Sequence, residues 1–482
     1  MRRLLAAGAL LLLPLSSCHL DHGGSSIRRV MVVEGPVWVG LLPEQRHGLR
    51  LLLEDLVETA GATVLPAPSG DGPAPPGVLR ITLGGTLSSG SLRLQGRLQT
   101  AQGLERDVVP DAVGPGAQLR QLLEVAGLHS SASAAILPRD PAHLLPLAAV
   151  YAAAVEGTDQ EARAANGPAE TLAILEPTCA PAALACAQSS YRRLLTQNPD
   201  DLDAQVTCAR AFDTALRLLP GFPRAAGDAG DAGRFYTDTG NQRRALEVLF
   251  GAARLWPWSP GLRTSMAYAA RTTGLLQGAL AALRVKTRLD EGVSAREELP
   301  EAAYLYTGDW DRFEASLGPG PSERPDPLVD FYRGYLRLLQ GRREEALTSF
   351  RSAARPLGTA TQFQALSRVY QLGLQGHRPE ALLALRGLAL SRRDLRAPDG
   401  EFTFKLAEAY GFLDSPEEAL NTAQAAFSQG FGCTAWYERT PLLAALRGLP
   451  RWRALDSHLQ ERQALLETRF SARTFGAKVP GA

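Results

Sequence analysis

Small and large side chains recur at fixed offsets through the second half of this 482-residue chain. Small residues let two helices approach closely, large ones fill the space to the next pair, and proline ends the second helix. This period restricts the fold strongly, because each unit can bury its apolar face only against a neighbour. The clearest copy is DAGRFYTDTGNQRRALEVLFGAARLWPW, with spaced positions Gly233, Tyr236, Ala245, Leu249, Ala252 and Pro257.

Two further segments carry the same offsets. The first, DFYRGYLRLLQGRREEALTSFRSAARP, places Gly334, Ala346, Phe350 and Ala353. The second, FKLAEAYGFLDSPEEALNTAQAAF, places Ala407, Tyr410 and Ala419. Weaker copies lie near residues 187, 267 and 376, so we expect about six or seven repeats within residues 142–470. These offsets resemble those of the tetratricopeptide (TPR) family, and the resemblance implies an all-α solenoid that binds a protein or peptide on its concave face.

The last apolar segment, GFGCTAWYERTPLLAALRGLPRWRALDSHLQ, resembles the closing segment of TPR regions related to bacterial adenylate cyclases and kinase-associated proteins. Trp436, Arg439, Pro441 and Leu442 stand at the positions that carry this likeness. We expect the segment to seal the open apolar end of the stack. Residues 471–482 are predicted to form a tail.

The amino terminus has the pattern of a secretory signal. Arg2 and Arg3 precede an apolar run, 4–15, that is shorter than the roughly 20 residues needed to cross a membrane. The run ends in Leu-Ser-Ser-Cys, which resembles the lipobox of bacterial lipoproteins. The resemblance implies that Cys18 carries acyl chains such as palmitate, which anchor the protein stably when several act together. Because His19 follows and not aspartate, the resemblance implies an outer-membrane anchor facing the periplasm. The alternative is a plain signal peptide that contains a cysteine.

Residues 19–27 read as a tether, and residues 28–128 as a small α/β domain. Apolar runs or alternation predict strands at 30–34, 62–66, 78–85 and 92–100, with a turn at SSGS. Helical spacing predicts helices at 49–60 and 117–128. The order strand, helix, strand, hairpin, helix resembles the amino-terminal domain of TolB and FlgO-like outer-membrane proteins. That resemblance implies a periplasmic protein-contact module without known chemistry. Residues 129–141 are predicted to be a linker.

The sequence offers little for catalysis. Net charge is +1, from 51 basic and 50 acidic residues, so no overall field attracts nucleic acid. No phosphate-binding loop, dinucleotide fingerprint, HExxH or GxSxG motif occurs, and we expect neither an enzyme nor a cofactor. His19, Asp21 and His22 are too few for a metal site. Asp200, Asp201 and Asp203 lack the later glutamate of a calcium loop and are better explained as a helix cap.

Four cysteines follow Cys18. An exported protein can keep disulfides. Cys179 could pair with Cys186, or Cys186 with Cys208, and the alternative is that these residues stay free and buried. Their spacing fits no zinc site. The remaining cysteine is Cys433.

Two functions compete on the sequence alone. The first is a lipid-anchored, non-catalytic scaffold whose TPR repeats bind a protein or peptide. The second is a ligand-sensing lipoprotein derived from a signalling protein, with a small-molecule site in the α/β domain. An inert spacer is a third reading. The partner and the oligomeric state stay open.

Overall fold

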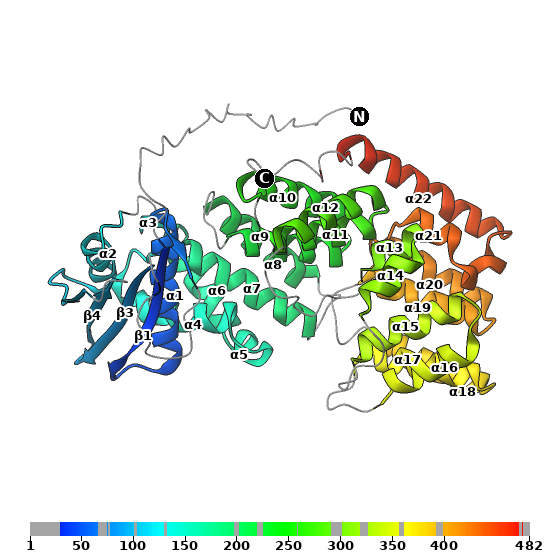
Figure 1. Ribbon diagram of the computed structural model, residues 1–482, viewed down its shortest axis with the longest axis horizontal. Coiled ribbons are helices and arrows are strands. Elements are labelled where there is room, and N and C mark those ends of the chain that lie inside the picture. Colours follow the sequence, from blue (N-terminus) through cyan, green and yellow to red (C-terminus); the bar gives the residue numbers. More distant parts are fainter. Residues whose placement is uncertain are drawn as a thin grey trace, which may run out of the picture.

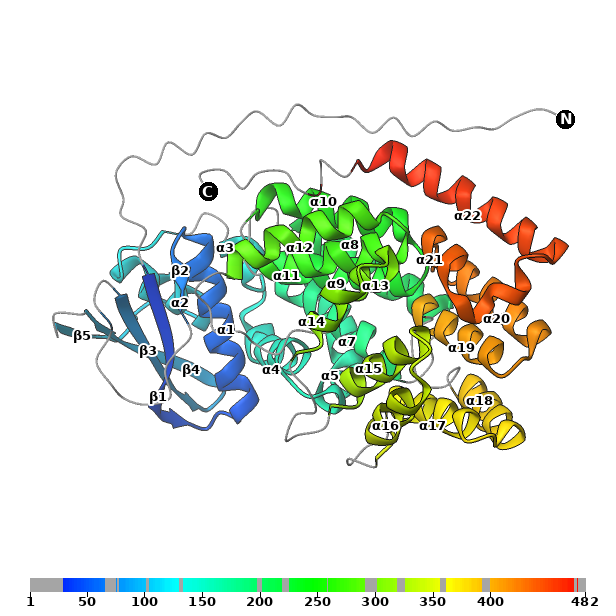
Figure 2. The same cartoon turned by 45° about the vertical axis from the view of Figure 1, so that its right-hand side comes forward.

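The computed structural model places a small sheet domain at one end of the molecule and helices over the remainder (Figures 1 and 2). It describes residues 29–65, 75, 78–100, 104–129, 133–196, 202–218, 225–257, 259–290, 301–318, 326–355, 361–391, 399–471 and 475. Cys18 and the tether lie outside these ranges. Within them, no helix has the length and apolar character that a membrane crossing requires.

Five strands form one mixed sheet in the order β2-β1-β3-β4-β5. β1 runs parallel to β2 and β3, and the pairs β3–β4 and β4–β5 are antiparallel. Four strands match the predicted ones. β5 was not predicted, because its sequence ERDV shows no apolar alternation. The bounds are Arg29–Val39 (β1), Thr63–Val64 (β2), Val78–Ser88 (β3), Ser91–Gln99 (β4) and Glu105–Val108 (β5).

Two helices cover one face of the sheet. Leu52 and Leu56 of α1 (Pro43–Thr59) and Leu122 of α2 (Pro115–Val125) belong to the same buried core as Ile81 and Leu83 of β3. The opposite face of the sheet is polar. The small α/β domain expected from the sequence is therefore present, with its predicted helices.

α1 also packs on its other side against α4 (Leu144–Val155), so one continuous core joins the sheet domain to the first helices. The Tyr151 hydroxyl donates to Asp55 Oδ2 at 2.8 Å inside this contact. The predicted linker differs from what we find. The segment 129–141 contains α3 (Ser133–Ile136), a 3₁₀ turn (Pro141–His143) begins at its last residue, and Ile136 and Leu137 are buried. A linker prediction fails here because a four-residue helix has too short a period to detect.

A charged cluster closes the same junction. His47 of α1 lies between two carboxylates, with Nδ1 3.2 Å from Glu34 of β1 and Nε2 2.7 Å from Glu156 after α4. Arg50 donates to Glu156 at 3.3 Å and also to Glu54. The hydrogen bond to Glu156, followed by that to Glu34, raises the pKa of His47 to about 9.

This cluster predicts a pH dependence of stability. Because the pKa of His47 rises from 6.5 to about 9 on folding, its stabilising contribution is complete below pH 6.5 and is lost as pH rises through 9. We expect urea unfolding between pH 6.5 and 9 to show a falling free energy, and His47→Gln to remove part of that fall. His377→Gln, at an exposed position before α18 (Arg378–Ser391), is the matched control and should keep the wild-type slope. An unchanged slope in His47→Gln would contradict the prediction.

Beyond α4, the described chain is helical up to residue 469. Two short helices, α5 (Asp159–Ala164) and α6 (Asn166–Leu175), precede a series of successive helix pairs. These pairs are α7 (Ala180–Thr196) with α8 (Leu202–Leu218), α9 (Ala225–Asp238) with α10 (Gln242–Leu255), α11 (Pro260–Thr272) with α12 (Leu276–Asp290), α13 (Ala302–Thr307) with α14 (Trp310–Ser316), α15 (Pro327–Leu339) with α16 (Arg343–Ala353), α17 (Gln362–Leu374) with α18, and α19 (Gly400–Phe412) with α20 (Pro416–Ser428). The closing elements are α21 (Thr434–Arg439), a 3₁₀ helix (Pro441–Leu446) and α22 (Pro450–Arg469).

The last elements return to the earlier ones. Arg271 of α11 and Glu401 of α19, 130 residues apart, form a two-pronged ion pair with N–O distances of 3.0 and 2.8 Å. The Gly432 amide donates to the Thr272 carbonyl at 2.7 Å. Phe475, in the predicted tail, is fully buried against Phe250 of α10, with ring centroids 4.6 Å apart. The last helices and Phe475 therefore contact helix pairs that lie much earlier in the chain.

Candidate functional site

The predicted repeat positions lie inside the helix pairs. A Cβ on Gly233 would be 2.6 Å from Leu249, and one on Gly334 would be 3.0 Å from Phe350. At each glycine, the large side chain of the partner helix therefore packs in the space that a Cβ would occupy. Pro257 is half-buried just after α10 ends at Leu255. The others are all buried: Tyr236, Ala245, Ala252, Ala346, Ala353, Ala407, Tyr410 and Ala419.

Where α7, α9 and α11 meet, several polar side chains are only partly buried. Asp238, at the end of α9, accepts hydrogen bonds from Tyr191 of α7 at 2.8 Å and from Tyr268 of α11 at 2.6 Å. Arg234, one turn earlier, is exposed. We call Tyr191, Arg234, Asp238 and Tyr268 the inner face, because the cluster faces the start of α19, where Asp399 acts on Asp238. Burial, followed by the negative charge of Asp399, raises the pKa of Asp238 to about 7.

The neighbouring helix α19 offers no such surface. Every residue from Gly400 to Tyr410 is buried. Lys405 lies among the rings of Tyr306, Tyr335 and Trp436, with Nζ 4.2 Å from the Tyr335 centroid. Its ammonium also donates to Glu408 at 3.0 Å. At this end of the helical region, side chains of the chain itself enclose α19.

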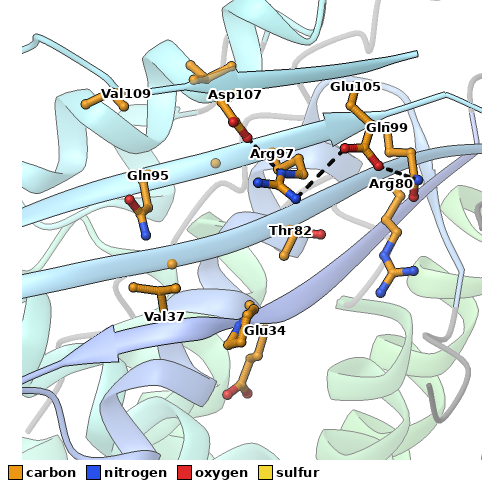
Figure 3. Close-up of a pocket in the computed structure, with 15 residues that line it drawn as sticks. Glu34, Val37, Arg80, Thr82, Gln95, Arg97, Gln99, Glu105, Asp107 and Val109 are labelled. Carbon is orange, nitrogen blue, oxygen red and sulfur yellow. Dashed lines mark hydrogen bonds and ion pairs between the residues drawn. The ribbon is translucent and has the colours of Figure 1, made fainter. Parts of the chain in front are cut away.

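The open face of the sheet forms a second candidate site, a hollow of about 620 Å³ (Figure 3). Side chains one residue apart on the strands alternate between the two faces, so cross-strand neighbours line up in rows. One row is Thr82–Arg97–Asp107, and another is Arg80–Gln99–Glu105. Both point away from the helices.

Each row contains a hydrogen bond between β4 and β5, and the ion pair of Arg97 with Glu105 at 3.9 Å links the two rows. Arg97 Nε donates to Asp107 at 2.7 Å, and Gln99 Nε2 donates to Glu105 at 2.9 Å, as the dashed lines in Figure 3 show. Arg97 is 55% exposed and Asp107 70%, so this pair adds little to stability. The lining can instead donate and accept hydrogen bonds to a polar ligand.

An irregularity in β1 lies at the wall of the hollow. From Glu34 to Trp38, β1 advances four residues while β3 advances only two, from Leu83 to Gly85. A bulge of this kind bends the strand and re-aims its side chains. The Val37 carbonyl consequently lies over Gly84, where a Cβ would be only 2.8 Å from that oxygen. Gly-Pro at 35–36 fits such a bulge, because β2 pairs with β1 at Arg29 and Val30, before this segment.

The described cysteines are all free and buried: Cys179, Cys186, Cys208 and Cys433. The two disulfides considered from the sequence are therefore absent from the structure. Burial raises the pKa of Cys179 to about 12 and of Cys186 to about 11, which leaves both thiols inert. Over the described ranges, no cluster of three His, Cys, Asp or Glu side chains could hold a metal ion. His19, Asp21, His22, Asp200 and Asp201 lie outside those ranges, and Asp203 is exposed near the start of α8.

Comparison with known proteins returned nothing: no protein-family model matches the chain, and a search of curated proteins found no relative. Site geometry is therefore the basis for any functional argument.

Sequence reasoning missed the two buried ion pairs and the sheet hollow. Arg271 and Glu401 are far apart in the chain and carry no local pattern. Lys405 had a detectable signal, because it is one of only three lysines in a chain with 51 basic residues. The compact ammonium of Lys405 fits among three aromatic rings, and arginine is not equivalent to lysine at such a site.

Proposed function

We propose that this protein is a lipid-anchored, non-catalytic scaffold of the bacterial cell envelope, built from TPR-like repeats and facing the periplasm. The observation that carries the proposal is the pairing of Gly233 with Leu249 and of Gly334 with Phe350 across successive helix pairs. Repeated pairs of this type build extended surfaces for protein recognition. The resemblance of the amino terminus to a lipobox supports the anchor, and the TolB/FlgO-like pattern supports an envelope role for the sheet domain.

We propose that the partner binds at the inner face, because this part of the helical region keeps exposed polar side chains. Arg234 is exposed and Tyr268 half-buried, whereas α19 is enclosed. Tyrosine and arginine are the residues most enriched where binding energy concentrates in protein interfaces. We propose that a protein or peptide segment contacts Arg234 and Tyr268.

Site-specific photocrosslinking tests this assignment in cells that produce the full chain. A photoreactive amino acid at position 234 is expected to give a discrete adduct with one protein, which Tyr268→Ala weakens. The same probe at position 383, where Leu383 of α18 is 73% exposed, is the control and should give none. Equal adducts at both positions, or none at 234, would overturn the proposal.

The anchor has its own test. Metabolic labelling with a palmitate analogue should mark the wild-type protein and not Cys18→Ala, which should also leave the membrane fraction. His19→Ala is the matched control and is expected to keep the label. A Cys18→Ala protein that still labels and still sediments with membranes defeats this part of the proposal.

The hollow on the sheet favours a second candidate function, the binding of a small polar ligand. Its support is the polar lining around Arg97, Gln95 and Thr82 beside the β1 bulge. A thermal-shift screen of sugars, amino acids and nucleotides should then find one compound class that stabilises the wild type but not Gln95→Ala. If no class does so, this function is ruled out.

A further inference from the structure

A second hollow, of about 540 Å³, lies between the start of α10 and the last helix, α22. α22 contributes Arg462, Leu465, Leu466 and Arg469, which share one helix face because they are three, four and seven residues apart. The turn before α10 and its first residues, Gly240 to Arg243, form the other wall. This hollow belongs neither to the inner face nor to the sheet.

The wall is strongly basic. Arg243 and Arg469 share a single carboxylate, Glu247, at 3.0 and 2.7 Å. Arg462 forms no ion pair with a carboxylate in the described part of the chain. Its guanidinium donates instead to the carbonyls of Phe427 at 2.9 Å and Gly430 at 3.4 Å. The hollow is therefore lined by three guanidinium groups, of which two share the carboxylate of Glu247 and the third has none among the described residues.

Two further features favour an anion in this place. Burial lowers the pKa of Arg462 to about 10, so a bound anion would relieve an uncompensated positive charge. α10 also begins here, with Asn241 as its cap, so its first amides add positive potential.

The hollow also has an apolar side. Leu465 is 75% exposed although it lies on the face of α22 that carries the arginines, and Leu466 beside it is buried. A simple inorganic anion would leave Leu465 unused. A ligand with an anionic head and a short apolar stem would contact both kinds of side chain.

We propose that the hollow between α10 and α22 binds the phosphate or carboxylate head of an amphiphilic ligand, with its apolar stem on Leu465. Arg243 and Arg469 contact the head group. Arg462 adds positive charge to the hollow while it donates to the carbonyls of Phe427, in the last turn of α20, and of Gly430. This assignment stands on its own contacts and does not rest on the scaffold function.

Calorimetric titration of the full chain tests the site with hexyl phosphate, hexanoate, inorganic phosphate and hexylammonium. We expect hexyl phosphate or hexanoate to bind at least tenfold more tightly than inorganic phosphate, and hexylammonium not to bind. Arg243→Gln/Arg469→Gln should weaken binding about tenfold or more, since hydrogen bonds to charged groups contribute about 1.5–3 kcal/mol each. Leu465→Ser should affect hexyl phosphate but not inorganic phosphate.

Arg254→Gln, at an exposed position in the last turn of α10, is the matched control and should bind as the wild type does. Arg462 is left intact because its substitution would uncap α20. Flotation with vesicles of phosphatidylglycerol or of phosphatidylcholine distinguishes the two sources of such a ligand. Binding to phosphatidylglycerol vesicles alone, lost in the double variant, identifies a lipid headgroup. Binding to neither kind of vesicle identifies a soluble amphiphile. The proposal is overturned if the double variant binds hexyl phosphate and hexanoate as well as the wild type does, or if neither binds the wild type.

Discussion

Replacing Lys405 by methionine is expected to lower the free energy of unfolding by about 3–5 kcal/mol. Glu408 is fully buried, and the ammonium 3.0 Å away neutralises it. Methionine keeps much of the side-chain volume but removes that charge, so the carboxylate stays buried without its ion-pair partner. Urea unfolding followed by circular dichroism measures the loss.

The double variant Lys405→Met/Glu408→Met separates the charge effect from packing. Replacing a whole buried ion pair by apolar residues is often neutral or stabilising by about 1–4 kcal/mol, so the double variant should recover most of the loss. Thr440, which donates to Glu408 at 2.7 Å and is fully buried, loses that acceptor in the double variant, so the recovery should be large but incomplete. If the free energy of unfolding of Lys405→Met lies within about 1 kcal/mol of the wild-type value, this explanation is contradicted, because an unpaired buried charge destabilises by about 3–5 kcal/mol.

Gly48→Val is the second substitution with a large expected effect. A Cβ on Gly48 would be 1.8 Å from the Ala148 carbonyl oxygen, which is main chain and cannot rotate away. α1 and α4 would have to separate along the contact that joins the sheet domain to the helices. Overpacking of this kind costs about 3 kcal/mol or more, well above the few tenths that valine gains over glycine in a helix.

A matched control exists in α10. Gly251 is also helical, and a Cβ there would meet nothing within 4 Å. Gly251→Val should therefore leave the midpoint of urea unfolding unchanged or slightly higher. Similar midpoints for the two variants would show that the α1–α4 approach is looser than the structure has it.

The sequence predicts elements well where a period is long enough to be read. The strands at 30–34 and 78–85 and the helix at 49–60 follow from alternation or helical spacing, and all three are present. Recurring small residues at 233, 334 and 407 likewise mark where helices pair. These signals work because each depends on neighbours within one or two turns of the same element.

Long-range features escape this reasoning. The sequence around Arg271 does not indicate that Glu401 is its ion-pair partner, because any of the chain's many acidic residues could take that position. The bulge in β1 moves two residues out of register, and alternation cannot reveal it since Gly-Pro carries no apolar signal. Phe475 belongs by sequence to a polar tail, but in the structure its ring packs in a pocket, here called the socket, beside Phe250 and Gly278. The contacts between the last helices and the earlier ones, and both hollows, therefore cannot be predicted from local sequence patterns.

The socket for Phe475 affects how the chain matures. Phe250 and Phe475 are separated by 225 residues, so at about 5–20 residues per second the ribosome needs roughly 10–45 s to supply the second after the first. Throughout that interval α10 and α12 expose an apolar surface that only the carboxyl end can cover. Nascent chains stalled before residue 475 should consequently be the forms that chaperones hold and proteases remove.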